Sequence, residues 1–244
     1  MNTITEDKGS LRVGIMQPYF LPYVGYFQLI QSVDVFIVYD NIQYTKKGWI
    51  NRNRMLQNGK DVLFSIPLAK DSDYLAVCDR KISTDFNRDK LLSQVSGAYR
   101  PAPYFQQTFP LIEQIVRREE QNLFLYIHHS IVKVCEHLGL TTKIKLSSQI
   151  AIDHELRSQD KVLALCRAEG AAVYVNAIGG TALYSSNRFQ EEGVALKFID
   201  SKPLIYTQFD SEFIPNLSIL DVLMFNPVDT IMSHIKSGHK LVEQ

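Results

Sequence analysis

Short apolar runs along the chain alternate with segments in which apolar residues recur every three or four positions. Runs of strand length occupy residues 11–16, 34–40, 61–68, 171–176 and 194–200. Segments with helical spacing lie beside several of these runs, at residues 25–31, 158–169 and 181–192. Strands that alternate with helices of this length pair in parallel through right-handed crossovers. The pattern therefore predicts an α/β fold, Rossmann-like, with a mostly parallel sheet flanked by helices.

The middle and the C-terminal part of the chain predict further helices. These cover residues 85–99, 104–118, 123–137 and 216–225, with a short last helix that ends near Gly238. The predicted caps are Asn122 and Gly139 for the longest helix, and Ser158 and Gly170 for the helix at 158–169. We therefore expect a disordered tail at residues 1–10 and one α/β domain over residues 11–244, with a helical middle section.

Composition and charge narrow the choice of partners. The chain has 244 residues, 45% of them hydrophobic, and Lys plus Arg equals Asp plus Glu at 26 each. Such a balance gives no reason to expect nucleic acid or an anionic membrane as a partner. The opening MNTITEDKGS lacks the order of a secretory signal, and no apolar run reaches the roughly 18 residues of a membrane span. We expect a cytoplasmic protein without membrane insertion, and a homodimer remains open.

Cysteine and histidine give no metal-binding pattern. Cys78, Cys135 and Cys166 are widely spaced and form no C-x-x-C pair, so we expect reduced thiols. His128 and His129 are adjacent, and on a helix adjacent side chains diverge by about 100°. We therefore expect no metal site.

The first candidate site is the aromatic turn after the first predicted strand, RVGIMQPYFLPYVGYFQLI. Its Y-V-G-Y, residues 23–26, has the layout of the H-x-G-H signature of nucleotidylyltransferases, with tyrosine in both histidine positions. Tyrosine cannot become a cation near neutral pH, so adenylylation chemistry is not expected to survive. The rings instead offer stacking faces and phenolic hydrogen bonds for a base, a sugar ring or an acyl carrier. The alternative is an aromatic minicore that caps the sheet. The predicted substrate-binding residues here are Gln17, Tyr19, Tyr23 and Tyr26.

The second candidate is the basic block YDNIQYTKKGWINRNR at residues 39–54, which follows the second predicted strand. Its four positive charges within nine residues predict an anion site, and Trp49 can stack on a ring. Strand alternation would direct Arg52 and Arg54 to one side and the asparagines to the other. The alternative is a solvated hairpin whose lysines protect a sheet edge. The predicted substrate-binding residues are Gln43, Trp49, Asn51, Arg52, Asn53 and Arg54.

Two residues of this block are the catalytic candidates. Asp40 stands where a strand ends, which is where a parallel sheet presents its working carboxylates. It could act as a general base, orient a ribose, or cap the following turn. Lys47 is the second candidate, as a positive point charge.

The third candidate is YVNAIGGTALY at residues 174–184, where a strand runs into two glycines before a predicted helix. Backbone amides at such a junction can hold a carboxylate, phosphate or thioester oxygen. The alternative is a tight turn that requires positive φ. The predicted substrate-binding residues are Asn176, Gly179 and Gly180.

Together these segments resemble the WbqC-like family, found in bacterial O-antigen and other surface-polysaccharide clusters. The resemblance rests on M-Q-P-Y-F-L-P-Y-V-G-Y-F-Q, on the basic block, on Y-V-N-A-I-G-G-T-A-L-Y and on N-L-S-I-L-D-V-L at residues 216–223. Ala177 stands where the family pattern has proline. The resemblance implies an enzyme that attaches an acyl or aminoacyl group to the amine of a nucleotide-linked amino-dideoxy sugar.

The expected ligands follow from that resemblance. We expect no tightly bound cofactor. The sequence does not identify the activated donor, which could be a carrier-protein thioester, coenzyme A, aminoacyl-tRNA or ATP; the neutral net charge makes tRNA the least favoured of these. An acyl or peptidyl carrier protein is therefore a candidate partner. An ATP-using nucleotidyltransferase and a non-catalytic nucleotide-sugar binding protein are the alternatives. Each of them requires that the three segments converge on one cleft.

Overall fold

The computed structural model describes residues 10–209 and 212–243. The predicted N-terminal tail therefore lies, apart from Ser10, outside the described residues. None of the helices in the described part of the chain combines the length and apolarity that a membrane crossing requires.

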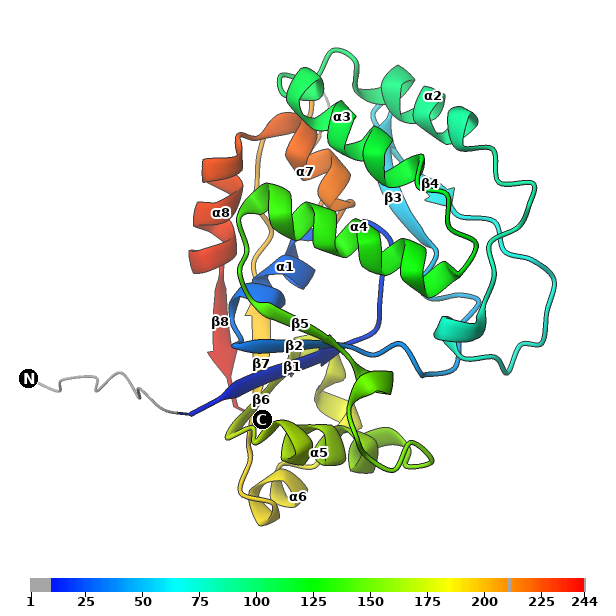
Figure 1. Ribbon diagram of the computed structural model, residues 1–244. Coiled ribbons are helices and arrows are strands. Elements are labelled where there is room, and N and C mark those ends of the chain that lie inside the picture. The colour runs from blue at the N-terminus through cyan, green and yellow to red at the C-terminus, as the bar shows by residue number, and fades with distance from the viewer. Residues whose placement is uncertain (1–9, 210–211, 244) are drawn as a thin grey trace, which may run out of the picture.

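A six-stranded sheet organises the molecule, and its strands are β1 (Arg12–Met16), β2 (Val35–Val38), β5 (Lys143–Leu146), β6 (Val173–Ala177), β7 (Ala195–Ser201) and β8 (His239–Val242) (Figure 1). The order across the sheet is β5-β2-β1-β6-β7-β8. The β7–β8 pair is antiparallel, and the other neighbours are parallel. This arrangement confirms the Rossmann-like α/β prediction. The order reverses between β1 and β6, which is the point where such sheets leave a crevice for ligands.

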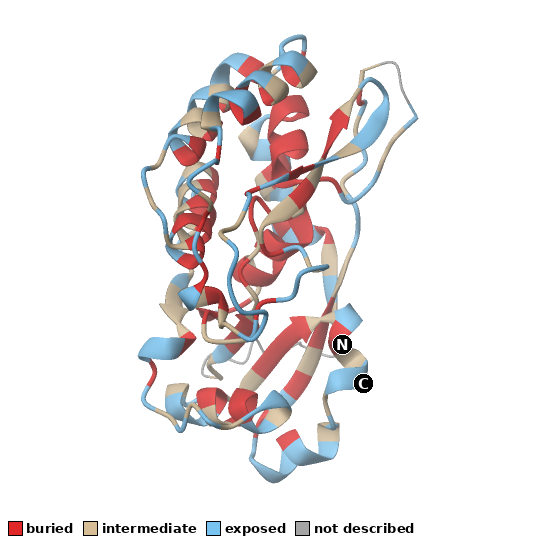
Figure 2. Ribbon diagram, turned by 90° about the vertical axis from the view of Figure 1, so that its right-hand side faces the viewer, coloured by how far each residue is buried: buried red, intermediate tan, exposed pale blue. Residues whose placement is uncertain are grey.

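Helices cover both faces of the sheet. One face carries α1 (Val24–Gln31), α4 (Leu123–Leu138), α7 (Ile219–Phe225) and α8 (Val228–Ser237), and the other carries α5 (Ser158–Glu169) and α6 (Ser186–Glu191) (Figure 1). Alternate strand residues divide between the two faces. Val35 and Ile37 join the core beside α5, whereas Phe36 and Val38 join the core beside α1 and α4. The central strands are therefore buried along most of their length (Figure 2).

The segment between β2 and β5 forms a second layer of structure beyond the sheet. It contains the hairpin β3 (Arg52–Gln57) and β4 (Lys60–Ser65), the 3-10 helix η1 (Val77–Asp79), and helices α2 (Arg88–Tyr99), α3 (Phe105–Val116) and α4. The strand predicted at 61–68 is found as β4, and it lies outside the main sheet, because it pairs with β3 alone among the described strands. Asn58 and Gly59, both with positive φ, form the two-residue turn between them.

Several local predictions fail for identifiable reasons. The helix predicted at 181–192 is broken into the 3-10 helix η3 (Ile178–Leu183) and α6. Strand β5, K-I-K-L, is too short to give an apolar run, and β8 was also missed. Asn122 and Gly139 cap α4 as predicted, but Ser158 lies inside α5, and Arg157 precedes the helix without a side-chain cap.

A buried carboxylate ties α7 to the second layer. Asp221 is fully buried, and its Oδ2 accepts a hydrogen bond from the Tyr99 hydroxyl at 2.7 Å. The same hydroxyl accepts from the Leu56 backbone N–H at 2.8 Å. The other carboxylate oxygen accepts from Tyr206 Oη at 2.5 Å and from Gln208 Nε2 at 2.9 Å. Burial raises the pKa of Asp221, and these hydrogen bonds oppose that rise.

We expect Tyr99→Phe to lower the free energy of unfolding by about 1–3 kcal/mol, because it leaves a buried N–H and a buried carboxylate oxygen unpaired. Urea denaturation followed by circular dichroism measures the change. Tyr74→Phe is the matched control, since the Tyr74 side chain is 85% exposed and loses the same hydroxyl at the surface. Equal stability of the two variants would contradict the structural role of the network.

Candidate functional site

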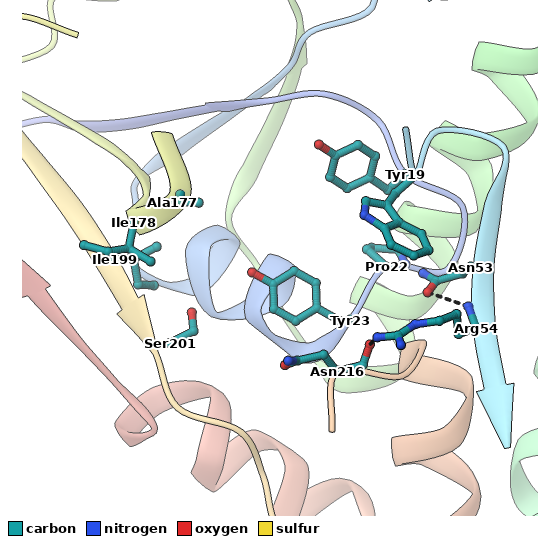
Figure 3. Close-up of a pocket in the computed structure, with 12 residues that line it drawn as sticks. Tyr19, Pro22, Tyr23, Asn53, Arg54, Ala177, Ile178, Ile199, Ser201 and Asn216 are labelled. Atoms are coloured by element: carbon teal, nitrogen blue, oxygen red, sulfur yellow. Dashed lines mark hydrogen bonds between the residues drawn. The ribbon is translucent and has the colours of Figure 1, made fainter. Parts of the chain in front are cut away.

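Two adjoining cavities lie at the carboxyl ends of β1 and β6, at the reversal of strand order. The larger has a volume of about 840 Å³ and is lined by both strand ends, through Met16, Gln17, Asn176 and Ala177. The smaller has a volume of about 440 Å³ (Figure 3). Both cavities share the lining residues Tyr19, Tyr23, Trp49, Ala177 and Gly179. The aromatic turn, the basic block and the glycine segment therefore converge on one cleft.

Gly25 gives the Tyr23 ring its place above the first turn of α1. A Cβ atom at residue 25 would lie 2.3 Å from Tyr23 Cε2 and 2.7 Å from its hydroxyl oxygen, so only glycine leaves this ring where it is. Figure 3 shows Tyr23 in the middle of the smaller cavity, between Arg54 on one side and Ile178 on the other. The glycine of Y-V-G-Y thus acts by positioning an aromatic side chain.

The remaining aromatic residues of the turn divide between the cleft and the core. Tyr19 lines both cavities, and its hydroxyl donates to Gln17 Oε1 at 3.2 Å. Tyr26 borders the larger cavity but is only 2% exposed, and its hydroxyl donates to the Gln17 carbonyl at 3.0 Å. Phe20 and Phe27 are fully buried. The ligand-site and minicore interpretations therefore each describe part of this turn.

The phenols that face the larger cavity are neutral at physiological pH. Burial raises the pKa of Tyr19 to about 12, and Tyr23 adds to that rise. Burial likewise raises the pKa of Tyr39 to about 12, and it raises the pKa values of Tyr23 and Tyr184. These hydroxyls can donate and accept hydrogen bonds, but they are poor bases.

Arg54 brings a positive charge to the smaller cavity. Its Nη1 forms an ion pair with Asp61 Oδ2 at 2.8 Å, and its Nη2 donates to the Asn216 carbonyl at 3.4 Å (Figure 3). The guanidinium lies 5.7 Å from the Trp49 ring centroid. Trp49 is 44% exposed although it lines both cavities, so its ring has a free surface at the mouth of the cleft.

The two asparagines of the basic block bind the backbone. Asn53 lines the smaller cavity, and its Nδ2 donates to the Leu21 carbonyl at 2.8 Å. Asn51 donates to the Ile66 carbonyl at 2.7 Å and accepts from the Tyr44 hydroxyl at 2.8 Å. Among the described lining residues of the two cavities Asn51 does not occur, so its predicted contact with substrate is replaced by a structural one.

Of three other polar residues of this block, Gln43 lines the cleft, whereas Arg52 and Lys47 are not among its described lining residues. Gln43 lines the larger cavity and donates to the Asp73 carbonyl at 3.2 Å. Arg52 Nε donates to the Gly48 carbonyl at 2.9 Å, and Lys47 is exposed. Neither Arg52 nor Lys47 is among the described residues that line the cleft, so the catalytic assignment of Lys47 has no geometric support.

Asp40 is also displaced from the cleft. It is 2% exposed, and its carboxylate accepts hydrogen bonds from Ser147 Oγ at 2.7 Å, Ser148 N at 2.9 Å and Ser148 Oγ at 2.5 Å. Among the described lining residues of the two cavities it does not occur. Its acceptor sites are occupied, so the base assignment is corrected: Asp40 joins the end of β2 to the turn after β5.

The paired glycines have different surroundings. A Cβ at Gly180 would lie 2.6 Å from Asn176 Nδ2, so this glycine makes room for an amide that lines the larger cavity. A Cβ at Gly179 would meet no atom within 4 Å, at the junction of the two cavities. Neither glycine has a positive φ, so the interpretation as a turn that requires positive φ is wrong.

Hydrogen bonds between distant segments hold the walls of the smaller cavity together. Leu21 has a positive φ of 44°, and its carbonyl accepts from Asn53 Nδ2 and from Ser218 Oγ at 2.7 Å. Ser218 N donates to the Arg54 carbonyl at 2.9 Å, and Ile219 N donates to the Pro22 carbonyl at 2.8 Å. The turn after β1, strand β3 and the start of α7 thus form one hydrogen-bonded frame.

Several cleft residues were not identified from the sequence. Tyr39 and Tyr184 line the larger cavity and stand at the ends of two quoted motifs, so their position in those motifs was an available signal. Asn216, in the smaller cavity, likewise begins a quoted motif. Other polar residues that were missed are Ser158 and Gln159 in the first turn of α5 and Ser201 in the smaller cavity. No local pattern distinguishes these three, because long-range packing brings them to the cleft.

The described lining residues of the cleft include no cysteine. Burial raises the pKa of Cys78 to about 11 and the pKa values of Cys135 and Cys166 to about 12, and none of the three is among the described lining residues. Within residues 10–209 and 212–243, no group of three or more His, Cys, Asp or Glu side chains could hold a metal ion.

Comparison with known proteins covers most of the residues that line the cleft. A model of the WbqC-like protein family matches residues 17–233. The chain is also similar to the Uncharacterized protein Rv1507c of Mycobacterium tuberculosis, at 29% identity over 221 residues that span 88% of this chain and 93% of that protein. The family match includes Gln17, the basic block, the paired glycines and Asn216. The chain therefore belongs to the WbqC-like protein family.

Proposed function

We propose that this protein binds a nucleotide-linked aminosugar in the two joined cavities and transfers an acyl or aminoacyl group to the amine of the sugar. The observation that carries the proposal is the pair of adjoining cavities at the strand-order reversal, with Tyr19, Tyr23 and Trp49 in the lining of both. An extended ligand made of a ring and a charged linker requires such a pair of connected spaces.

The larger cavity suits a sugar with few hydroxyl groups. None of its described lining residues is Asp, Glu, His, Lys or Arg. Aromatic rings can stack on the apolar face of a sugar, and the amides of Gln17 and Asn176 can bind its remaining hydroxyls. Aliphatic residues complete the lining, among them Ile15, Leu29, Val162 and Leu183. Such a surface favours a deoxy sugar over a fully hydroxylated one.

The smaller cavity supports the charged part of the ligand. Arg54 is the charged residue among its described lining residues, and Asp61 already occupies one side of its guanidinium. The adjacent Trp49 ring offers a stacking surface for a nucleobase. The nucleotide would therefore extend from the sugar toward Trp49 and Arg54.

The transfer itself needs little from ionised side chains. The amine nitrogen attacks the carbonyl carbon of the activated acyl group, the bond from that carbon to the leaving atom of the donor breaks, and the leaving group takes the proton that the amine releases. Alignment of the two reactants and hydrogen bonds to the developing oxyanion lower the barrier of such a reaction. Neutral phenols such as Tyr23 can donate those hydrogen bonds. A carrier-protein thioester, coenzyme A or an ATP-derived acyl group would serve as the donor.

A non-catalytic nucleotide-sugar binding protein is the second candidate. The observation that favours it is that Asp40 and Lys47, the expected catalytic groups, both lie outside the described lining of the cleft. An adenylylating activity has less support, because the second histidine position of H-x-G-H is taken by Tyr26, whose hydroxyl is engaged by the Gln17 carbonyl.

Mass spectrometry of a dTDP-linked aminosugar incubated with a panel of donors tests the reaction. We expect the sugar nucleotide to gain the mass of the acyl or aminoacyl group with one member of the panel. Release of AMP and pyrophosphate without acylation would instead indicate nucleotidyl transfer. Saturable binding of the sugar nucleotide without any product would favour the binding protein.

Gly179→Leu tests whether the ligand occupies the junction of the cavities. We expect it to weaken binding of a dTDP-linked aminosugar at least tenfold, or about 1.4 kcal/mol, with unchanged thermal stability, because a Cβ atom at residue 179 meets no protein atom within 4 Å. Isothermal titration calorimetry gives the affinity. Gly97→Leu in α2 is the control, since a Cβ there is equally free of contacts. Unchanged affinity in Gly179→Leu would remove the junction from the binding site.

Gly25→Ala tests the role of the Tyr23 ring. We expect Gly25→Ala and Tyr23→Leu each to weaken sugar-nucleotide binding roughly tenfold. The double variant should bind no more weakly than the single variants, because the alanine acts by displacing the ring that the leucine removes. Additive losses in this cycle, measured by calorimetry, would show that the two residues act separately.

A further inference from the structure

Arg80 is a buried cation without an acidic partner. It follows η1 and is 5% exposed. Its Nη1 donates to the Ser72 carbonyl at 2.8 Å, and its Nε is buried without a hydrogen-bond partner. Within the described residues no carboxylate forms an ion pair with its guanidinium. A buried charge with so few partners costs stability unless something else compensates it.

A second arginine lies near the same aromatic ring. The Arg80 guanidinium stands 4.8 Å from the Tyr44 ring centroid. The Tyr44 hydroxyl binds Asn51, and the next residue, Arg52, has its Nε on the Gly48 carbonyl. Gly48 N in turn donates to the Thr45 carbonyl at 3.1 Å, so Arg52 lies beside the residues that follow Tyr44. Burial raises the pKa of Tyr44, and the charges of Arg80, Arg52 and Lys46 oppose that rise.

Acidic groups do not balance these cations. The Lys46 ammonium forms an ion pair with Asp73 at 2.8 Å, and both side chains are more than half exposed, so this pair contributes little. Arg52, like Arg80, has no carboxylate partner among the described residues. Arg54 differs from both, because Asp61 compensates its charge.

The cationic group lies beside the larger cavity. Tyr44 N donates to the Leu75 carbonyl at 3.0 Å and Val77 N to the Ile42 carbonyl at 2.8 Å, so residues 42–44 run alongside residues 75–77. Ile42 and Gln43 both line the larger cavity. Tyr44, on which Arg80 stacks, is therefore the next residue along the chain after the cleft wall.

We propose that Arg80 and Arg52 form a phosphate-binding site at the rim of the larger cavity, with Lys46 as an additional positive charge. Arginine presents a planar set of donors that fits phosphate oxygens, and stacking on Tyr44 holds the Arg80 plane in a fixed orientation. The ligand class is a phosphate or pyrophosphate group.

The site goes beyond the proposed function and does not depend on it. Where the proposed function also holds, the pyrophosphate of the sugar nucleotide is the natural occupant, and that connection rests on the proposed function. Arg80, which the sequence did not indicate, would then help to hold the anion in addition to the ion-paired Arg54.

Titration of the full chain with inorganic pyrophosphate, followed by calorimetry at low and moderate salt, tests the site. We expect saturable binding, at least tenfold weaker in Arg80→Gln and in Arg52→Gln. Arg88→Gln is the matched control, because Arg88 also stacks on an aromatic ring, Phe86, and donates to a backbone carbonyl. Its affinity should stay within twofold of that of the original chain.

Absence of saturable binding by the original chain overturns the proposal, as does an affinity that neither arginine substitution changes. An equal loss in Arg88→Gln also overturns it, because binding would then follow overall charge. If Arg80→Gln fails to fold by circular dichroism, Arg52→Gln decides the outcome. One further outcome separates this site from the proposed function. If the original chain and Gly179→Leu both bind pyrophosphate, but the original chain does not bind the sugar nucleotide, the proposed function is contradicted and this site stands.

Discussion

The position of the cleft follows from the directions in which the chain leaves β1 and β6. After β1 it turns into α1 on one face of the sheet, and after β6 it turns into η3 and α6 toward the other face. Parallel strands whose connections part in this way leave a space between their carboxyl ends. The candidate ligand-binding residues lie on these two connections or on the other segments that line the cleft. The second layer between β2 and β5 supplies the outer wall, through Trp49, Asn53 and Arg54.

Charge and aromatic character are separated within this cleft. The larger cavity is built from neutral phenols, amides and aliphatic groups, whereas Arg54 brings a positive charge to the smaller cavity. A protein with no net charge can therefore still present a local positive field where a ligand enters. Burial keeps the phenols protonated, so recognition in the larger cavity depends on shape and hydrogen bonding.

The sequence predicted the features that depend on local pattern. The central strands, the long helix α4 with its caps, and the turn before Y-V-G-Y were all readable from periodicity and from residue types. The structural role of Asp40 could not be predicted from local pattern, because its partners Ser147 and Ser148 are more than a hundred positions away in the sequence. Arg80 belongs to none of the quoted motifs, and its surroundings depend on the loop around Ser72, whose carbonyl accepts a hydrogen bond from the Arg80 side chain. The hairpin was readable in part, since Asn58-Gly59 is a typical two-residue turn.

The frame around Leu21 joins its segments largely through main-chain atoms, with Asn53 and Ser218 as the side chains that complete it. The side chains of Tyr19 and Tyr23, which face the smaller cavity from this frame, take no part in those bonds. Their side chains could therefore be exchanged while the scaffold keeps its shape. This separation of support from contact makes the cleft a favourable starting point for engineering altered ligand selectivity.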